Sequence, residues 1–160
     1  MAAARDRRIL GAGAQAPDFQ LPELAGGSQN LSGLLAKGPV VLAFFKVTCP
    51  TCQFTFPFLE RMHRQNVPFV AISQDDDEST REFNAEFGIS FPALLDDPDA
   101  YPASNAYGIG SVPSLFLIEP DGRIGWSSEG FRRRELESLG RRFNVQPFQP
   151  GDYVPEWKAG

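Results

Sequence analysis

The sequence has few of the residues that mark membrane, metal-binding or nucleic-acid-binding proteins. None of its apolar runs approaches the roughly 18 residues of a membrane-spanning helix. Acidic residues outnumber basic ones, 20 against 15, and the net charge of −5 argues against a nucleic-acid partner, whose binding surface is usually basic. One histidine and two cysteines do not complete a tetrahedral metal site without a partner chain, so no metal is expected.

The N-terminal segment also lacks the apolar stretch of a retained secretory signal. Arg5, Arg7 and Arg8 are not followed by such a stretch, and 160 residues favour one domain. We therefore expect a flexible leader over residues 1–13, a folded domain over 14–143 and an extended tail over 144–160. This pattern predicts a cytoplasmic protein, or an exported one if a leader has been trimmed.

The only two cysteines, Cys49 and Cys52, lie two residues apart. This spacing is typical of a redox pair, since two cysteines are too few for a structural disulfide framework. The pair follows an apolar run over residues 40–46 and precedes an amphipathic helical pattern. The unpaired N–H groups and positive dipole of a helix N-terminus favour a thiolate. We expect Cys49 to be the nucleophile and Cys52, one turn further, to be more buried, with no cofactor required.

The remaining pattern predicts an α/β fold, a mixed sheet flanked by helices. An N-terminal β extension is expected over residues 16–31, where two prolines suit an edge strand. Asp75 to Glu78 are expected to be solvated residues that begin a helix, and Trp126 and Trp157 are expected to pack away from the cysteines. Strands are predicted at residues 40–46, 67–72, 91–95, 112–118 and 123–127, and longer helices after residues 52, 75 and 132.

Four segments resemble the thioredoxin superfamily, and within it the redoxin group of AhpC/TSA-like and TlpA-like proteins. The resemblance covers about residues 14 to 143 and implies a thioredoxin-like fold. Its segments are Gly13–Phe19, similar to G-x-x-A-P-x-F; Pro39–Cys52, a strand followed by the cysteine pair; Val70–Asp75, a second core strand; and Gly108–Gly122, which contains the V-P strand signature.

The resemblance implies thiol–disulfide exchange with a protein disulfide or dithiol, supported by a thiol electron donor. It implies that Pro113 follows a cis peptide bond and faces the cysteine pair, as only proline commonly allows. Val112 would then present its backbone to an extended substrate. Thr48 and Pro50, which flank Cys49, are expected to contact that substrate as well.

Lys46 and two missing acids distinguish the site from its relatives. Lys46 lies three residues before Cys49, as in the K-x-x-C-P-x-C segment of glutaredoxins, and could either activate the thiolate or face solvent. Ala43 stands where thioredoxins have a buried Asp, and Thr55 stands where many TlpA-like proteins have a Glu. Deprotonation of Cys52 is therefore expected to depend on water, Lys46 or a substrate group.

Two other functions compete with thiol–disulfide exchange. Peroxidases of the redoxin group use a T-x-x-C pattern and an Arg from a later strand. Here Cys49 occupies the Thr position, and the region of Val112 and Pro113 occupies the Arg position, which argues against a peroxidase. A redox-switched binding module, in which the pair regulates a partner without turnover, is the second alternative.

Overall fold

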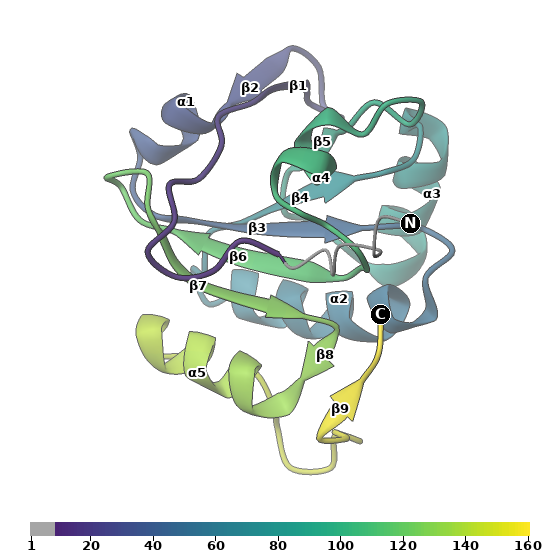
Figure 1. Ribbon diagram of the computed structural model, residues 1–160. Coiled ribbons are helices and arrows are strands. Elements are labelled where there is room, and N and C mark those ends of the chain that lie inside the picture. Colours follow the sequence, from purple (N-terminus) through teal and green to yellow (C-terminus); the bar gives the residue numbers. More distant parts are fainter. Residues whose placement is uncertain (1–8) are drawn as a thin grey trace, which may run out of the picture.

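Five strands form the central sheet of the computed structural model, which describes residues 9–160 (Figure 1). The strand order is β5-β4-β3-β6-β7, with β3, β4 and β5 parallel and β6 and β7 antiparallel to their neighbours. The mixed sheet predicted from the sequence is confirmed. Its strands are β3 (Val40–Phe45), β4 (Phe69–Ser73), β5 (Ala93–Leu95), β6 (Ser114–Ile118) and β7 (Ile124–Glu129).

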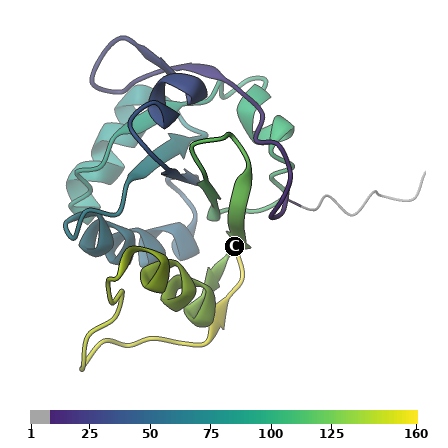
Figure 2. The same ribbon diagram turned by 90° about the vertical axis from the view of Figure 1, so that its left-hand side faces the viewer.

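Helices cover both faces of this sheet. Figures 1 and 2 show α2 and α5 on one side, and α1, α4 and the N-terminal segment on the other. Every residue of β3, β4 and β6 is consequently buried, which explains why these strands are continuous apolar runs and do not alternate. The helices are α1 (Leu31–Leu35), α2 (Pro50–His63), α3 (Asp77–Phe87), α4 (Pro102–Ala106) and α5 (Arg133–Phe143).

Aromatic side chains connect the helix that carries the cysteines to the sheet. The ring of Phe56 on α2 lies 4.5 Å from that of Phe45 on β3 and 5.5 Å from that of Phe83 on α3. Such tilted and edge-to-face pairs add to the stabilisation from buried apolar area. The N-terminus of α2 is therefore held on a rigid support at the end of β3.

The N-terminal extension forms a small sheet of its own. β1 (Gln20–Pro22) pairs antiparallel with β2 (Ser28–Asn30), so the predicted β extension is confirmed. Most of the leader expected over residues 1–13 lies outside the described residues. Its last part belongs to the folded domain, since the amides of Leu10 and Gly13 donate to the carbonyls of Tyr107 and Ile124. The domain thus begins before residue 14, because these amides find backbone partners.

The segment after α5 has little regular secondary structure, and its end returns to the domain. Its strand β9 (Trp157–Lys158) pairs antiparallel with β8 (Phe131–Arg132). The Arg61 guanidinium of α2 donates to the Asp152 carboxylate at 2.6 Å and fastens the middle of the tail. Figure 1 shows the C-terminal end beside the start of α2. No helix in residues 9–160 has the length and apolar character of a membrane span.

Candidate active site

Cys49 is the N-cap residue of α2. Its backbone is extended, and its Sγ accepts the N–H of Cys52 at 3.1 Å, the bond that a Ser or Asp side chain usually accepts at this position. Pro50 occupies the first helical position, where its missing N–H costs nothing. The C-P-T-C segment therefore folds locally into a helix start that presents one sulfur to the unpaired amides.

The surroundings of Cys49 stabilise its thiolate. Hydrogen bonds from the Cys52 thiol and from the amides of Cys52 and Thr51 lower the pKa of Cys49 from 9.0 to about 6, although partial burial opposes the shift. A pKa of this size leaves roughly nine-tenths of the thiol ionised at neutral pH. Cys49 is half-buried, so an ionised sulfur remains reachable from solvent.

Cys52 has the opposite character, as its position one turn into the helix predicts. Its side chain is fully buried. Burial, the Cys49 sulfur and the negative charge of Asp75 raise the pKa of Cys52, while a backbone hydrogen bond from Lys46 opposes the rise. Both cysteines are free thiols. The pair therefore combines one accessible thiolate with one buried, protonated thiol.

The Val112–Pro113 segment faces the cysteine pair. The peptide bond between these residues is cis, which confirms the prediction. The Val112 carbonyl oxygen lies 3.3 Å from Cys49 Sγ, although 63 residues separate them. The Pro113 carbonyl accepts the Gly130 amide at 2.8 Å, which fixes the loop to the turn before β8. The backbone of Val112 therefore lies directly beside the Cys49 sulfur.

Lys46 is not in open solvent, and its ammonium is not hydrogen-bonded to the Cys49 sulfur. Its half-buried ammonium donates to the Tyr101 hydroxyl at 3.3 Å and lies 5.3 Å from the centre of the Tyr101 ring. The hydrogen bonds that lower the pKa of Cys49 come from Cys52 and Thr51. Lys46 contributes a positive charge to the edge of the site from a position that Tyr101 holds.

A hollow of about 380 Å³ opens beside Cys49. Pro50 is exposed at its rim, and Thr48, also exposed, precedes Cys49 on the adjoining loop. Gln74, which sequence reasoning missed, is buried and donates to Ser104 Oγ at 3.0 Å. The residues that line the hollow are Lys46, Cys49, Pro50, Gln74, Ile109, Gly110, Ser111, Val112 and Gly160.

The sequence reasoning also assigned Asp75 to the wrong surroundings. It was expected among solvated residues opening a helix, but the N-cap of α3 is Asp76, and the half-buried Asp75 carboxylate instead accepts the Val47 amide at 2.8 Å. β4 ends at Ser73, which pairs with Phe45 of the parallel strand β3. Adjacent parallel strands end at the same sheet edge, so the strand register could have predicted this proximity to the cysteines.

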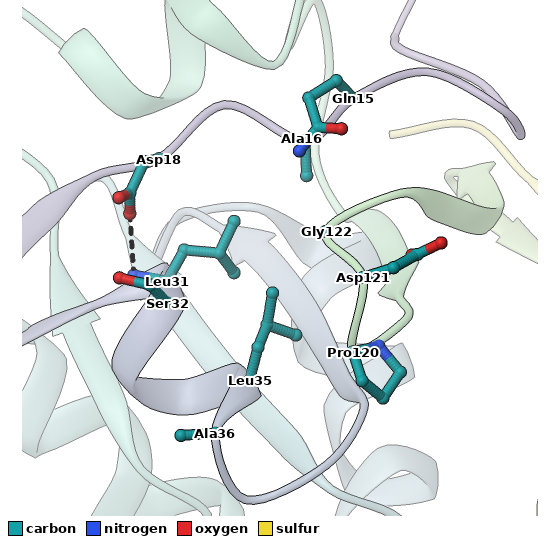
Figure 3. Close-up of a pocket in the computed structure, with 10 residues that line it drawn as sticks. All are labelled: Gln15, Ala16, Asp18, Leu31, Ser32, Leu35, Ala36, Pro120, Asp121 and Gly122. Carbon is teal, nitrogen blue, oxygen red and sulfur yellow. Dashed lines mark hydrogen bonds between the residues drawn. The ribbon is translucent and has the colours of Figure 1, made fainter.

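Another hollow, of about 360 Å³, lies far from the sulfurs between the N-terminal segment, α1 and the β6–β7 turn (Figure 3). The Asp18 carboxylate in its lining accepts the Leu31 N–H at 3.0 Å at the start of α1 and so has a structural role (Figure 3). Within residues 9–160, no group of three or more His, Cys, Asp and Glu side chains is placed to hold a metal ion.

The fold and this site together define a thioredoxin-fold thiol–disulfide oxidoreductase. A five-stranded mixed sheet positions an N-cap thiolate, a buried second thiol and a cis-proline loop at one point. The peroxidase and binding-module alternatives are not favoured. The position where a peroxidase has its Arg is occupied by the cis-proline loop, whose backbone contacts Cys49.

Residues 12–127 match the family model described as AhpC/TSA family, and the chain belongs to this family. Among curated proteins it is similar to the thiol-disulfide oxidoreductase ResA of Geobacillus thermodenitrificans, with 30% identity over 84% of this chain and 81% of the relative. ResA of Halalkalibacterium halodurans is 35% identical to this chain, and the match covers 74% of this chain and 69% of the length of that ResA. A Chlorobium tepidum structure, assigned as thiol:disulfide interchange protein DsbE, superposes with a TM-score of 0.74 at 26% identity, covering 86% and 97% of the chains.

Proposed function

We propose that Cys49 attacks protein disulfides and that Cys52 resolves the resulting mixed disulfide. The observation that carries this assignment is the contrast between the two sulfurs. Cys49 is half-buried with a pKa of about 6, whereas Cys52 is fully buried with a raised pKa. The thiolate is the nucleophile in disulfide exchange, so the pair enters the reaction in a fixed order.

The reaction balances as two exchanges. The Cys49 thiolate attacks one sulfur of a substrate disulfide, forms a mixed disulfide and releases the other substrate sulfur as a thiolate. Cys52 then loses its proton and attacks Cys49 Sγ, which releases the second substrate thiolate. The substrate gains two electrons, and the protein is left with a Cys49–Cys52 disulfide. A thiol electron donor restores the dithiol, and no other cofactor takes part.

Asp75 is the proposed acceptor of the Cys52 proton. The Val47 amide donates to the Asp75 carboxylate at 2.8 Å, and the adjacent residue, Lys46, bonds to Cys52 through its backbone. Two consecutive residues of one loop thus hold the carboxylate and the buried sulfur on either side of the same backbone, and the proposed transfer runs between these two groups. Protonation of Asp75 also removes a negative charge that opposes a thiolate at Cys52. This role replaces the acids absent at Ala43 and Thr55.

Substrate binding is proposed to use the rim of the hollow. The backbone of Val112 and the exposed residues Thr48 and Pro50 surround Cys49 and contact an extended polypeptide. Pro113 fixes the loop, and Lys46 supplies a positive charge. The proposed substrates are protein disulfides, because a backbone groove suits a chain better than a small molecule. The cytoplasmic location stays a prediction, and there thiols are kept reduced.

Insulin reduction with dithiothreitol tests this function. The wild-type protein should accelerate precipitation of the insulin chains, and Cys49→Ser should not. Cys52→Ser should instead accumulate a mixed disulfide on Cys49, visible by mass spectrometry under non-reducing conditions. Equal rates for the wild type and Cys49→Ser would overturn the proposal. Peroxide consumption with a thiol donor is the control, and we expect the insulin reaction to be the faster of the two.

A further inference from the structure

The tail strand runs directly past the start of α2. The Thr51 hydroxyl, inside the C-P-T-C segment, donates to the Ala159 carbonyl at 2.5 Å. Gly160 lines the same hollow as Cys49. These contacts join residues 108 positions apart. The end of the described chain therefore lies at the cysteine pair.

Gly160 approaches the backbone of Val112 so closely that no side chain would fit. A Cβ added at Gly160 would overlap the Val112 carbonyl oxygen and would lie 3.2 Å from the Val112 nitrogen. Val112 is also the residue whose carbonyl contacts Cys49 Sγ. The tail thus covers the backbone past which a substrate chain must run to reach Cys49.

Several weak contacts hold the tail in this position. The Arg133 amide donates to the Glu156 carbonyl at 3.0 Å, and β9 pairs with β8 over two residues. The Lys158 ammonium lies 5.0 Å from the centre of the Phe54 ring. Trp157 on this strand is 56% exposed, which corrects the expectation that it packs, because the two-residue ladder leaves this side chain uncovered. A ladder of only two residue pairs, with one strand at the end of the described chain, opens locally at low cost.

From this arrangement we propose that residues 157–160 form a strap over Val112 that determines which disulfides reach Cys49. A macromolecular substrate must displace the strap before its chain can lie along Val112. A small disulfide needs only the exposed part of the sulfur and reacts without displacement. The inference rests on the proposed function, since it assumes that Val112 contacts the substrate.

The need to displace the strap lowers the apparent affinity of the enzyme for a protein substrate. If only a fraction of molecules has the strap open, the apparent dissociation constant for a protein substrate rises by the inverse of that fraction. Releasing the strap should lower KM for a protein disulfide without changing kcat. It should leave the reaction with a small disulfide unchanged. If the tail had only a structural role, its release would not lower KM for the protein disulfide while leaving the reaction with the small disulfide unchanged.

The test compares Gly160→Ala with Gly11→Ala. The first introduces a Cβ that overlaps Val112, whereas a Cβ at Gly11 meets nothing within 4 Å. With insulin as the protein disulfide, Gly160→Ala should lower KM about threefold or more, and Gly11→Ala should not. With glutathione disulfide as the small probe, all three proteins should react at the same rate. Lys158→Ala, which removes the contact with Phe54, should lower KM for insulin in the same direction, and Lys158→Arg should not.

Two failures are distinguishable. An unchanged or higher KM for insulin in both Gly160→Ala and Lys158→Ala, with normal glutathione disulfide exchange, would overturn the strap. A wild-type protein no faster than Cys49→Ser with both insulin and glutathione disulfide would instead overturn the proposed function.

Discussion

The backbone N–H of Cys52 donates to the sulfur of Cys49 at 3.1 Å. This contact makes the first thiolate part of the helix cap, since it satisfies one of the amides that every helix start leaves unpaired. The Cys52 thiol donates to the same sulfur. One cysteine is therefore ionised because the other is protonated.

This coupling predicts the titration of Cys49. In the reduced protein, thiolate absorbance in the ultraviolet should rise with a midpoint at about pH 6. Cys52→Ala removes the side-chain donor, which is the largest cause of the lowered pKa, and should move the midpoint upward by about one unit or more. Cys52→Ser keeps a donor and should move it less. An unchanged midpoint in Cys52→Ala would show that the helix amides alone stabilise the thiolate.

Asp75→Asn should slow the resolution step by about tenfold or more, because it removes the proposed proton acceptor. Alkylation of Cys49 should remain fast, and mixed disulfide with insulin should accumulate. The defect should shrink as the pH rises, since hydroxide then removes the Cys52 proton. Asp77→Asn, at an exposed carboxylate paired with Arg81, is the matched control. An equal and pH-independent decrease of the resolution rate in both variants would indicate a purely structural effect.

The ionised Glu60 carboxylate should stabilise the fold, and this contribution should be lost in acid. Burial opposes ionisation of this carboxyl, but hydrogen bonds from the amide and hydroxyl of Ser90 and from Arg64 outweigh it and lower the pKa of Glu60. A lowered folded-state pKa stabilises the fold above the unfolded-state pKa, and this stabilisation is lost as the pH falls. Glu60→Gln should lower the free energy of unfolding by about 1–3 kcal/mol at neutral pH and flatten its decline in acid.

Urea unfolding at several pH values measures this effect, with Glu78→Gln at an exposed position as the control. The same acid decline in Glu60→Gln and the wild type would contradict the assignment.

Tyr107 should stabilise the attachment of the N-terminal segment. Its ring is fully buried 5.1 Å from that of Phe116, and its hydroxyl donates to the Pro17 carbonyl at 2.7 Å. Tyr107→Phe leaves that carbonyl without its donor and should cost about 1–2 kcal/mol in urea unfolding. Tyr153→Phe, at a side chain that is 73% exposed, should change little. Equal stability of the two variants would mean that the hydroxyl contributes nothing.

Several strands and helix ends of this fold can be predicted from the local sequence pattern. The apolar runs of β3 and β6 predict strands covered on both faces, and the C-P-T-C segment predicts a helix start, because burial and capping depend on residues close in sequence. Gly88 marks the end of α3 for the same reason, since its φ of 70° suits glycine. The cis bond before Pro113 was expected from the family resemblance.

The sequence by itself determined the redox pair and the fold that carries it, and it predicted the order in which the two sulfurs react. Only the tertiary structure decided what surrounds the pair. Strand register brings Asp75 to the Val47 amide, Tyr101 holds the Lys46 ammonium, and the tail returns to Thr51. These contacts join residues 28, 55 and 108 positions apart. No local pattern encodes them, because they depend on how the sheet orders its strands and where β9 finds a free edge.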